Sequence, residues 1–229
     1  MELVQGLVAA LQSYDWEKLG KLLVQLLEAS VVSIEIFALT LIFSVPLALL
    51  VAFGRMSRRR IVRAPIHFYI LVMRGTPLIL QIIFVYFAPY YLFRASYDRF
   101  TAVIVAFAIN YAAYFAEIFR GGIQSIPRGQ WEAAKVLGFG RADTFFRIIL
   151  PQVVKRILPA SANEVITLVK DTALAQTIAV AELLRVAQNA AARDFSTMPI
   201  FVAGVFYFVM NWAVSEFFLR WERRLEYYR

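Results

Sequence analysis

Long apolar stretches alternate with short charged stretches along most of this sequence. Three of the apolar stretches, 31–53, 100–119 and 199–219, come close to the roughly 20 residues that a helix needs to cross a bilayer core about 30 Å thick. A fourth, 153–174, is long enough only if it includes charged residues near its start, whose long side chains can reach the interface. The alternation predicts helices that span a membrane.

One apolar region, 61–93, would be about 50 Å long as a single helix, which exceeds the thickness of a bilayer core. The segment Arg-Gly-Thr-Pro at 74–77 interrupts it, because Pro77 lacks the amide that would continue the helix. We expect a kink here, a second span at 76–93, and Arg74 towards the cytoplasmic side, where it anchors the kink.

The basic residues predict an orientation. Of the 24 Lys and Arg residues, 16 lie in the segments 55–63, 120–156 and 220–229, and loops rich in these residues stay in the cytoplasm. The fold class is therefore an all-α membrane protein with five transmembrane helices, its N-terminus outside and its C-terminus inside. We expect the whole chain, 1–229, to form a single domain.

Composition agrees with this class and excludes others. The chain is 61% hydrophobic with a mean hydropathy of +0.64, above the apolar share of a soluble domain. Its net charge of +8 arises beside apolar spans and so favours anionic lipid over nucleic acid. There is no cysteine, His67 is the lone histidine, and no nucleotide-binding glycine loop is present. We expect no metal site, cofactor or catalytic site in this chain. Residues 1–10 lack a signal-peptide pattern, so we expect them to be retained.

The charged loop at 120–152 carries a spaced motif. Its members are Glu132, Ala133, Ala134, Gly138, Ile148, Leu150 and Pro151, with nine residues between Gly138 and Ile148. Pro127 suits the start of a helix and Gly138 suits its end, with good helix formers between them. We expect a short cytoplasmic helix, followed by a second helix at 141–150.

This motif resembles the EAA loop of ABC importer permeases, in which a short helix docks onto the ATPase. The resemblance implies a type I importer fold, with two permease subunits (a homodimer or a pair of paralogues), two ABC ATPases and an extracytoplasmic binding protein. ATP and Mg²⁺ would bind the partner ATPase, and the complex would lie in a bacterial or archaeal cytoplasmic membrane. The predicted coupling residues are Glu132, Ala133, Ala134, Gly138, Arg128 and Lys135.

Further segments narrow the resemblance to permeases for polar amino acids, the group that includes histidine, arginine, glutamine and opine importers. These segments are Arg74 to Leu78 with Gln81, Leu150 to Gln152, Leu158-Pro159, Asn163-Glu164 and Lys170 to Thr172.

Polar residues inside spans are expensive and usually face a partner or a watery cavity. Spacing places Asn110, Tyr114 and Glu117 on one helix face. The predicted substrate contacts are Glu117, Asn163, Glu164, Asn110, Tyr114, Thr167 and Asp171. The acidic ones mildly favour a basic amino acid. Alternatively, Glu117 pairs with Arg120, and polar residues of the fourth span bridge helices. Two other functions stay open: a secondary transporter or channel without an ATPase, and a structural membrane scaffold.

Overall fold

The computed structural model describes residues 16–225, and within them every regular element is a helix. The elements are α2 (Trp16–Arg55), α3 (Arg60–Gly75), α4 (Leu78–Phe93), α5 (Arg99–Gln124), α6 (Arg128–Val136), α7 (Arg141–Asp143), the π-helix η1 (Thr144–Ile149), α8 (Leu150–Asp171), the 3-10 helix η2 (Thr172–Ile178), α9 (Leu183–Asp194) and α10 (Met198–Leu225). The expectation that residues 1–10 are retained lies outside the described residues.

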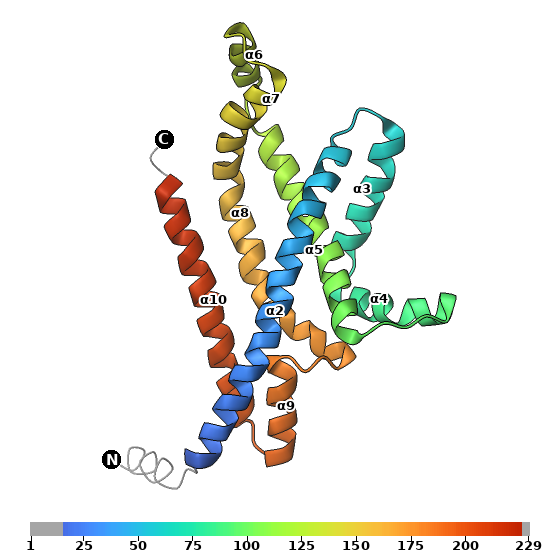
Figure 1. Cartoon of the computed structure of the whole chain (residues 1–229), viewed down its shortest axis with the longest axis vertical. Coiled ribbons are helices and arrows are strands. Elements are labelled where there is room, and N and C mark those ends of the chain that lie inside the picture. Colours follow the sequence, from blue (N-terminus) through green and yellow to red (C-terminus); the bar gives the residue numbers. More distant parts are fainter. Residues whose placement is uncertain (1–15, 226–229) are drawn as a thin grey trace.

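Four long helices, α2, α5, α8 and α10, run along the long axis of the molecule (Figure 1). Helix α6, the turn between α2 and α3, and the end of α10 all lie at one end, and α9 lies at the other. The three arginine-rich segments are therefore brought to one end of the molecule, as a shared cytoplasmic side requires. The side of the membrane itself stays a prediction.

Three described helices are long and apolar enough to cross a bilayer: α2, α5 and α10. The bent pair α3 and α4 would make a fourth if it counts as one span. Helix α8 is not in this group, because it carries Lys155, Arg156, Glu164, Lys170 and Asp171. Five spans therefore stays a prediction, although helices cover all five predicted stretches.

Helix α2 begins 15 residues before the predicted span 31–53. Its 40 residues give a length of about 60 Å. Its polar first turns are stabilised by an ion pair one turn apart, in which Lys21 Nζ lies 2.7 Å from Glu17 Oε1. Because a bilayer core is only about 30 Å thick, the N-terminal part of α2 extends well beyond it.

The predicted break at 74–77 is confirmed, and it is sharp: α3 and α4 are bent by 113°. Thr76 and Pro77 are both extended, with ψ of 147° and 134°, because a residue before proline avoids the helical region. The segment 76–93 does not continue as an upright span, since α4 turns across the long axis while α3 packs antiparallel to α2 (Figure 1). Arg74 lies near the end of α3, about 21 Å along the helix from Arg60, and its side of the membrane stays a prediction.

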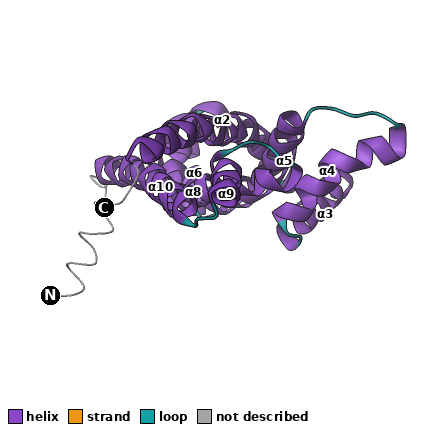
Figure 2. Ribbon diagram, turned by 90° about the horizontal axis from the view of Figure 1, so that it is seen from below, coloured by secondary structure: helices purple, strands orange, loops and turns teal. Residues whose placement is uncertain are grey.

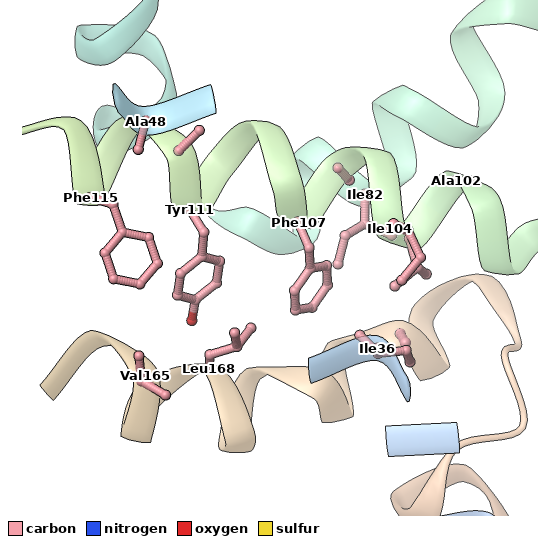
Figure 3. Packing of buried hydrophobic residues seen from close by; sticks show 14 of the residues in the cluster. Ile36, Ala48, Ile82, Ala102, Ile104, Phe107, Tyr111, Phe115, Val165 and Leu168 are labelled. Carbon is pink, nitrogen blue, oxygen red and sulfur yellow. The ribbon is translucent and has the colours of Figure 1, made fainter. Parts of the chain in front are cut away.

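Helix α5 is the centre of the packing. In its most apolar 18-residue window 72% of the residues are buried, against 28% for α2 and 11% for α10, so α5 is enclosed by the chain while most of the apolar surface of the other two is left uncovered. Phe107, Tyr111 and Phe115 point from α5 towards Leu168 and Val165 of α8 (Figure 3). Viewed from below, α3 and α4 project to one side of the body formed by the other helices (Figure 2).

Candidate functional site

A cavity of about 370 Å³ lies between the C-terminal end of α2, one face of α3 and the second half of α5. We call it the α3–α5 cavity. It is lined by Arg55, His67, Ile70, Leu71, Arg74, Gly75, Tyr114 and Glu117. His67, Leu71 and Arg74 are spaced by four and three residues, so they lie on one face of α3, and this face lines the cavity with a polar residue at each end. A larger hollow of about 570 Å³ runs along the end of α10, but all its lining residues come from that one helix.

Glu117 is held by arginines at the edge of this cavity. Arg120 Nη2 lies 2.6 Å from Glu117 Oε2, and Arg120 Nε donates to Oε1 at 3.0 Å. Arg55 Nε lies 3.8 Å from the same Oε1. The Glu117 side chain is 17% exposed, so the pairing offsets much of the cost of burying its charge. The alternative of an Arg120 ion pair is thus present, while Glu117 also lines the cavity as a substrate contact would.

Arg74 was not among the predicted substrate contacts, yet it lines the cavity. Its guanidinium carbon lies 5.3 Å from the centroid of the Tyr114 ring, which is a cation–π distance. Among the described residues no carboxylate oxygen lies within 4.0 Å of it, although its charge acts on both Glu117 and Glu164. The clue in the sequence was the seven-residue spacing from His67, which puts both side chains on one face of α3.

The kink is held by other side chains, so the prediction that Arg74 anchors it was wrong. Gln81 Nε2 donates to the carbonyls of Met73 (3.0 Å) and Thr76 (3.1 Å), which the break leaves without helical partners. Asn110 Nδ2 donates to the same Met73 carbonyl at 3.2 Å and to Gln81 Oε1 at 2.9 Å. Asn110 is buried and is engaged at the break, away from the α3–α5 cavity.

The polar residues of α8 divide between two faces. Asp171 accepts a hydrogen bond from Tyr111 Oη of α5 at 2.8 Å, and Glu164 is half-buried and interacts electrostatically with Tyr111 and Arg74. Asn163 is exposed and Thr167 is half-buried. Helix α8 thus turns Glu164 and Asp171 towards α5 and leaves Asn163 on the outside. None of these four residues lines the α3–α5 cavity in the described part of the chain.

At the end of the molecule where the basic segments meet, α6 lies on an apolar platform, which is a separate small core. This core consists of Ile126, Ile149 and Val153 with Ile123, Trp131, Phe145, Ile148 and Ile157 packed around them. Trp131 and Ala134 face this platform, and Ala134 is only 1% exposed. Its methyl group therefore allows close packing within the chain, and its role in coupling to a partner stays a prediction. Gly138 has a φ of +80°, so the expected sharp turn is confirmed.

The outward face of α6 carries the other predicted coupling residues. Glu132, Ala133, Arg128 and Lys135 are all exposed. Val136 and Leu137 are 87% and 73% exposed, which is unusual for apolar side chains outside a bilayer. This end of the molecule therefore combines charged and apolar groups on one accessible helix, as a protein-binding surface does.

The predicted second helix, 141–150, has no end of its own. Helix α7 passes into η1 and then into α8, and the backbone stays right-handed helical at Asp143, Thr144 and Leu150. Pro151 has no amide to donate to the carbonyl four residues earlier, and a π-helical turn just before it relieves the clash of its ring. The turn below α6 is consequently joined to α8 by one continuous helix.

A buried carboxylate at the opposite end was missed by the sequence analysis. Glu182 is fully buried and caps α9, accepting bonds from the amides of Leu184 (2.8 Å) and Arg185 (2.7 Å) and from Tyr207 Oη of α10 (2.8 Å). Burial raises the pKa of the Glu182 carboxyl above its ordinary value. Glutamate is not a preferred N-cap, so the local sequence gave little sign of this role.

The apolar exterior and the charged cavity beside a broken helix define a membrane-integral transport subunit. Residues 44–227 match the family model described as the binding-protein-dependent transport system inner membrane component, and the chain belongs to this family.

Relatives and solved structures agree with that assignment. The chain is 40% identical to the octopine transport system permease protein OccM of Rhizobium radiobacter, over 79% of this chain and 80% of that protein. It is 36% identical to the glutamine transport system permease protein GlnP of Escherichia coli K12, over 93% and 98%. A crystal structure of an amino acid ABC transporter with histidines is similar at a TM-score of 0.84 and 33% identity, covering 93% of this chain and 99% of that chain. The MetNI methionine ABC transporter shares the fold at a TM-score of 0.70 and 15% identity, covering 93% and 99%.

Proposed function

We propose that this chain forms the translocation path of an ATP-driven importer for polar amino acids in a bacterial or archaeal cytoplasmic membrane. The relatives named above are permeases for octopine and glutamine, which supports an amino-acid substrate. The acidic groups Glu117, Glu164 and Asp171 favour a basic side chain on that substrate. The partners are two ABC ATPases that bind ATP and Mg²⁺, a second permease copy and an extracytoplasmic binding protein. The second copy is this same chain or a paralogue.

One observation carries the proposal: the exposed helix α6 packs against a continuous helix, formed by α7, η1 and α8, that runs into the body of the molecule. Trp131 and Ala134 seat α6 on a platform that includes Ile149 of η1 and Val153 of α8. A displacement of α6 by an ATPase would therefore move η1 and α8 with it, since packed cores shift as units. Helix α8 carries Glu164 and Asp171 beside α5, so such a movement would change the polar groups that face the substrate path.

Coupled uptake tests this function. The permease is reconstituted in liposomes with the ATPase and binding protein encoded beside it, and uptake of radiolabelled arginine, histidine, glutamine and cystine is measured with and without ATP. We expect ATP-dependent uptake of at least one of them. Glu132→Lys should lower the amino acid imported per ATP hydrolysed by tenfold or more, because Glu132 is exposed on the proposed docking face.

Two controls make the result decisive. Glu17→Lys changes another exposed acid, in the first turn of α2 at the opposite end of the molecule, and should leave coupling unchanged. Uptake that persists without the ATPase would instead support a secondary transporter. A chain that assembles but transports none of the four amino acids would contradict the proposal.

A further inference from the structure

Four arginines lie together where the turn after α2 leads into α3, and no acidic residue accompanies them. We call them the arginine cluster, and they are Arg58, Arg59, Arg60 and Arg63. All four are exposed, and within residues 16–225 none of them lies within 4.0 Å of a carboxylate oxygen. The sequence has no Asp or Glu between Glu35 and Asp98, so this segment supplies no counter-charge of its own. The neighbouring Arg55 differs, because it reaches Glu117 at 3.8 Å.

The turn that carries the arginine cluster is short and is held by hydrogen bonds. Only residues 56–59 separate α2 from α3. The amide of Ser57 donates to the Gly54 carbonyl at 3.1 Å, and the amide of Arg59 donates to Ser57 Oγ at 3.2 Å. Gly54 also lies directly against α3, since a Cβ there would be 2.2 Å from Cδ1 of Ile66. The arginines are therefore presented at a fixed place, at the end of the molecule where the other basic segments meet (Figure 1).

The outer face of α3 continues from the cluster as an apolar surface. Helical spacing places Arg60, Ile61, Ala64 and Phe68 on this face, away from Ile66, which packs against α2. Ile61 is 83% exposed and Phe68 is 67% exposed. Figure 2 shows that α3 and α4 project to one side of the body formed by the other helices. An uncovered apolar surface with a basic end matches a phospholipid, whose acyl chains are apolar and whose headgroup carries the phosphate.

We propose that the arginine cluster binds the headgroup of an anionic phospholipid, with the acyl chains of that lipid on the outer face of α3. Guanidinium groups fit phosphate oxygens with paired hydrogen bonds. Each arginine close to an anionic membrane surface strengthens association by about fivefold. The inference requires only that the chain lies in a membrane, which its family provides, and it does not depend on the substrate.

A lipid at this place would set how deep the break between α3 and α4 lies in the bilayer. Helix α3 has 16 residues and is about 24 Å long, whereas the bilayer core is about 30 Å thick. With the first turn of α3 held at the headgroups, the break at 74–77 would lie about 24 Å into the core. The headgroup contact therefore fixes the level of the bend as well as the position of the turn.

Photolabelling in lipid nanodiscs tests the site. The full-length permease is placed in nanodiscs of phosphatidylcholine that contain a small fraction of a probe lipid with a photoactivatable diazirine in one acyl chain. The probe is either phosphatidylglycerol or phosphatidylcholine with identical acyl chains, and labelled peptides are identified by mass spectrometry. In the unsubstituted protein we expect the anionic probe to label α3 at least about tenfold more than the neutral probe.

Matched variants separate the headgroup contact from the acyl-chain contact. Arg60→Gln combined with Arg63→Gln removes two charges of the cluster and should reduce this preference on α3 to about twofold or less. Arg223→Gln combined with Arg224→Gln removes two exposed arginines from the end of α10, and it should leave the labelling of α3 unchanged. Phe68→Ser should lower the labelling by both probes alike and keep the preference between them. Co-purification with the ATPase checks that each variant is folded.

Equal labelling of α3 by the two probes in the unsubstituted protein would overturn the inference. An equal loss of preference in the α10 variant would also overturn it, because total charge at this end would then explain the result. The labelling is repeated with the ATPase bound, and a preference that disappears on its addition would assign the arginine cluster to that partner instead of to lipid. Coupled uptake is measured separately, so each of these outcomes leaves the proposed function standing.

Discussion

Adding one methyl group at Gly122 should separate α5 from α8. A Cβ at this position would lie 2.1 Å from Cγ2 of Ile157 and 3.3 Å from Cγ1 of Val153. Carbon atoms in contact prefer about 3.5–4.0 Å, so the methyl group overlaps Ile157 by well over 1 Å. The two helices must move apart at the level of the apolar platform under α6.

The adjacent Gly121 provides the matched control. A Cβ there meets nothing within 4 Å, so Gly121→Ala should stabilise the protein by up to about 1 kcal/mol through helix propensity alone. Gly122→Ala gains the same propensity but adds an overpacking cost of about 1–3 kcal/mol. We expect Gly122→Ala to be less stable than Gly121→Ala by about 1–3 kcal/mol, measured as thermal unfolding of the purified protein in detergent.

A second substitution tests the assigned cause. Ile157→Leu moves the branch away from the β-carbon and so removes the clashing Cγ2, and in combination with Gly122→Ala it should recover much of the loss. The non-additivity between these two positions should reach about 1 kcal/mol or more. Equal stability of the two alanine variants, or strict additivity of Gly122→Ala with Ile157→Leu, would refute the close contact.

Three other outcomes are expected. Asn110→Leu keeps the side-chain volume but removes two hydrogen bonds at the helix break, so it should destabilise the protein by about 1–3 kcal/mol in thermal unfolding. The control Asn163→Leu, at an exposed position, should have little effect, and equal losses of stability would contradict the role given to Asn110. Glu182→Ala removes the acceptor of two amides and of Tyr207 Oη, so proteolysis near α9 should become faster by about tenfold or more, and an unchanged rate would contradict the capping role of Glu182. Because burial raises the pKa of Glu182, the folded state keeps its proton to higher pH than the unfolded chain, so stability should fall as pH rises above the ordinary value of 4.5, and Glu182→Gln should flatten that slope in unfolding measured across pH.

Hydrophobic periodicity and arginine placement predicted the helical class, the breaking point at 74–77 and the single end at which basic segments meet. They did not predict the direction of α4. Pro77 dictates that a helix stops, but the new direction is fixed by Asn110 and Gln81, which lie far from the break in sequence or across it. The start of α2 was missed for a related reason, since its first turns are polar and are helical through pairing such as Glu17 with Lys21.

The residues of the candidate site were likewise predicted only in part. Local spacing correctly placed Tyr114 and Glu117 on one face of α5, and both line the cavity. Arg74 was missed because the cavity exists only when α2, α3 and α5 come together, and a single helix pattern does not reveal that wall. Ala134 is packed inside the chain, which the motif alone did not predict, because the platform beneath α6 forms only when α5, η1 and α8 come together.

The π-helical turn η1 lies within the continuous helix that leads from the turn after α6 into α8. It therefore affects how far α6 is rotated about the axis of that helix relative to α8. An α-helix advances about 100° with each residue, so one residue added or removed between α6 and α8 would swing the exposed face of α6 by that angle around the same axis. The nine residues that separate Gly138 from Ile148 therefore fix the rotation of α6 relative to α8. In the proposed coupling, they would determine which face of α8 turns when α6 is displaced, and a change of chain length there would redirect that movement without altering the docking surface of α6.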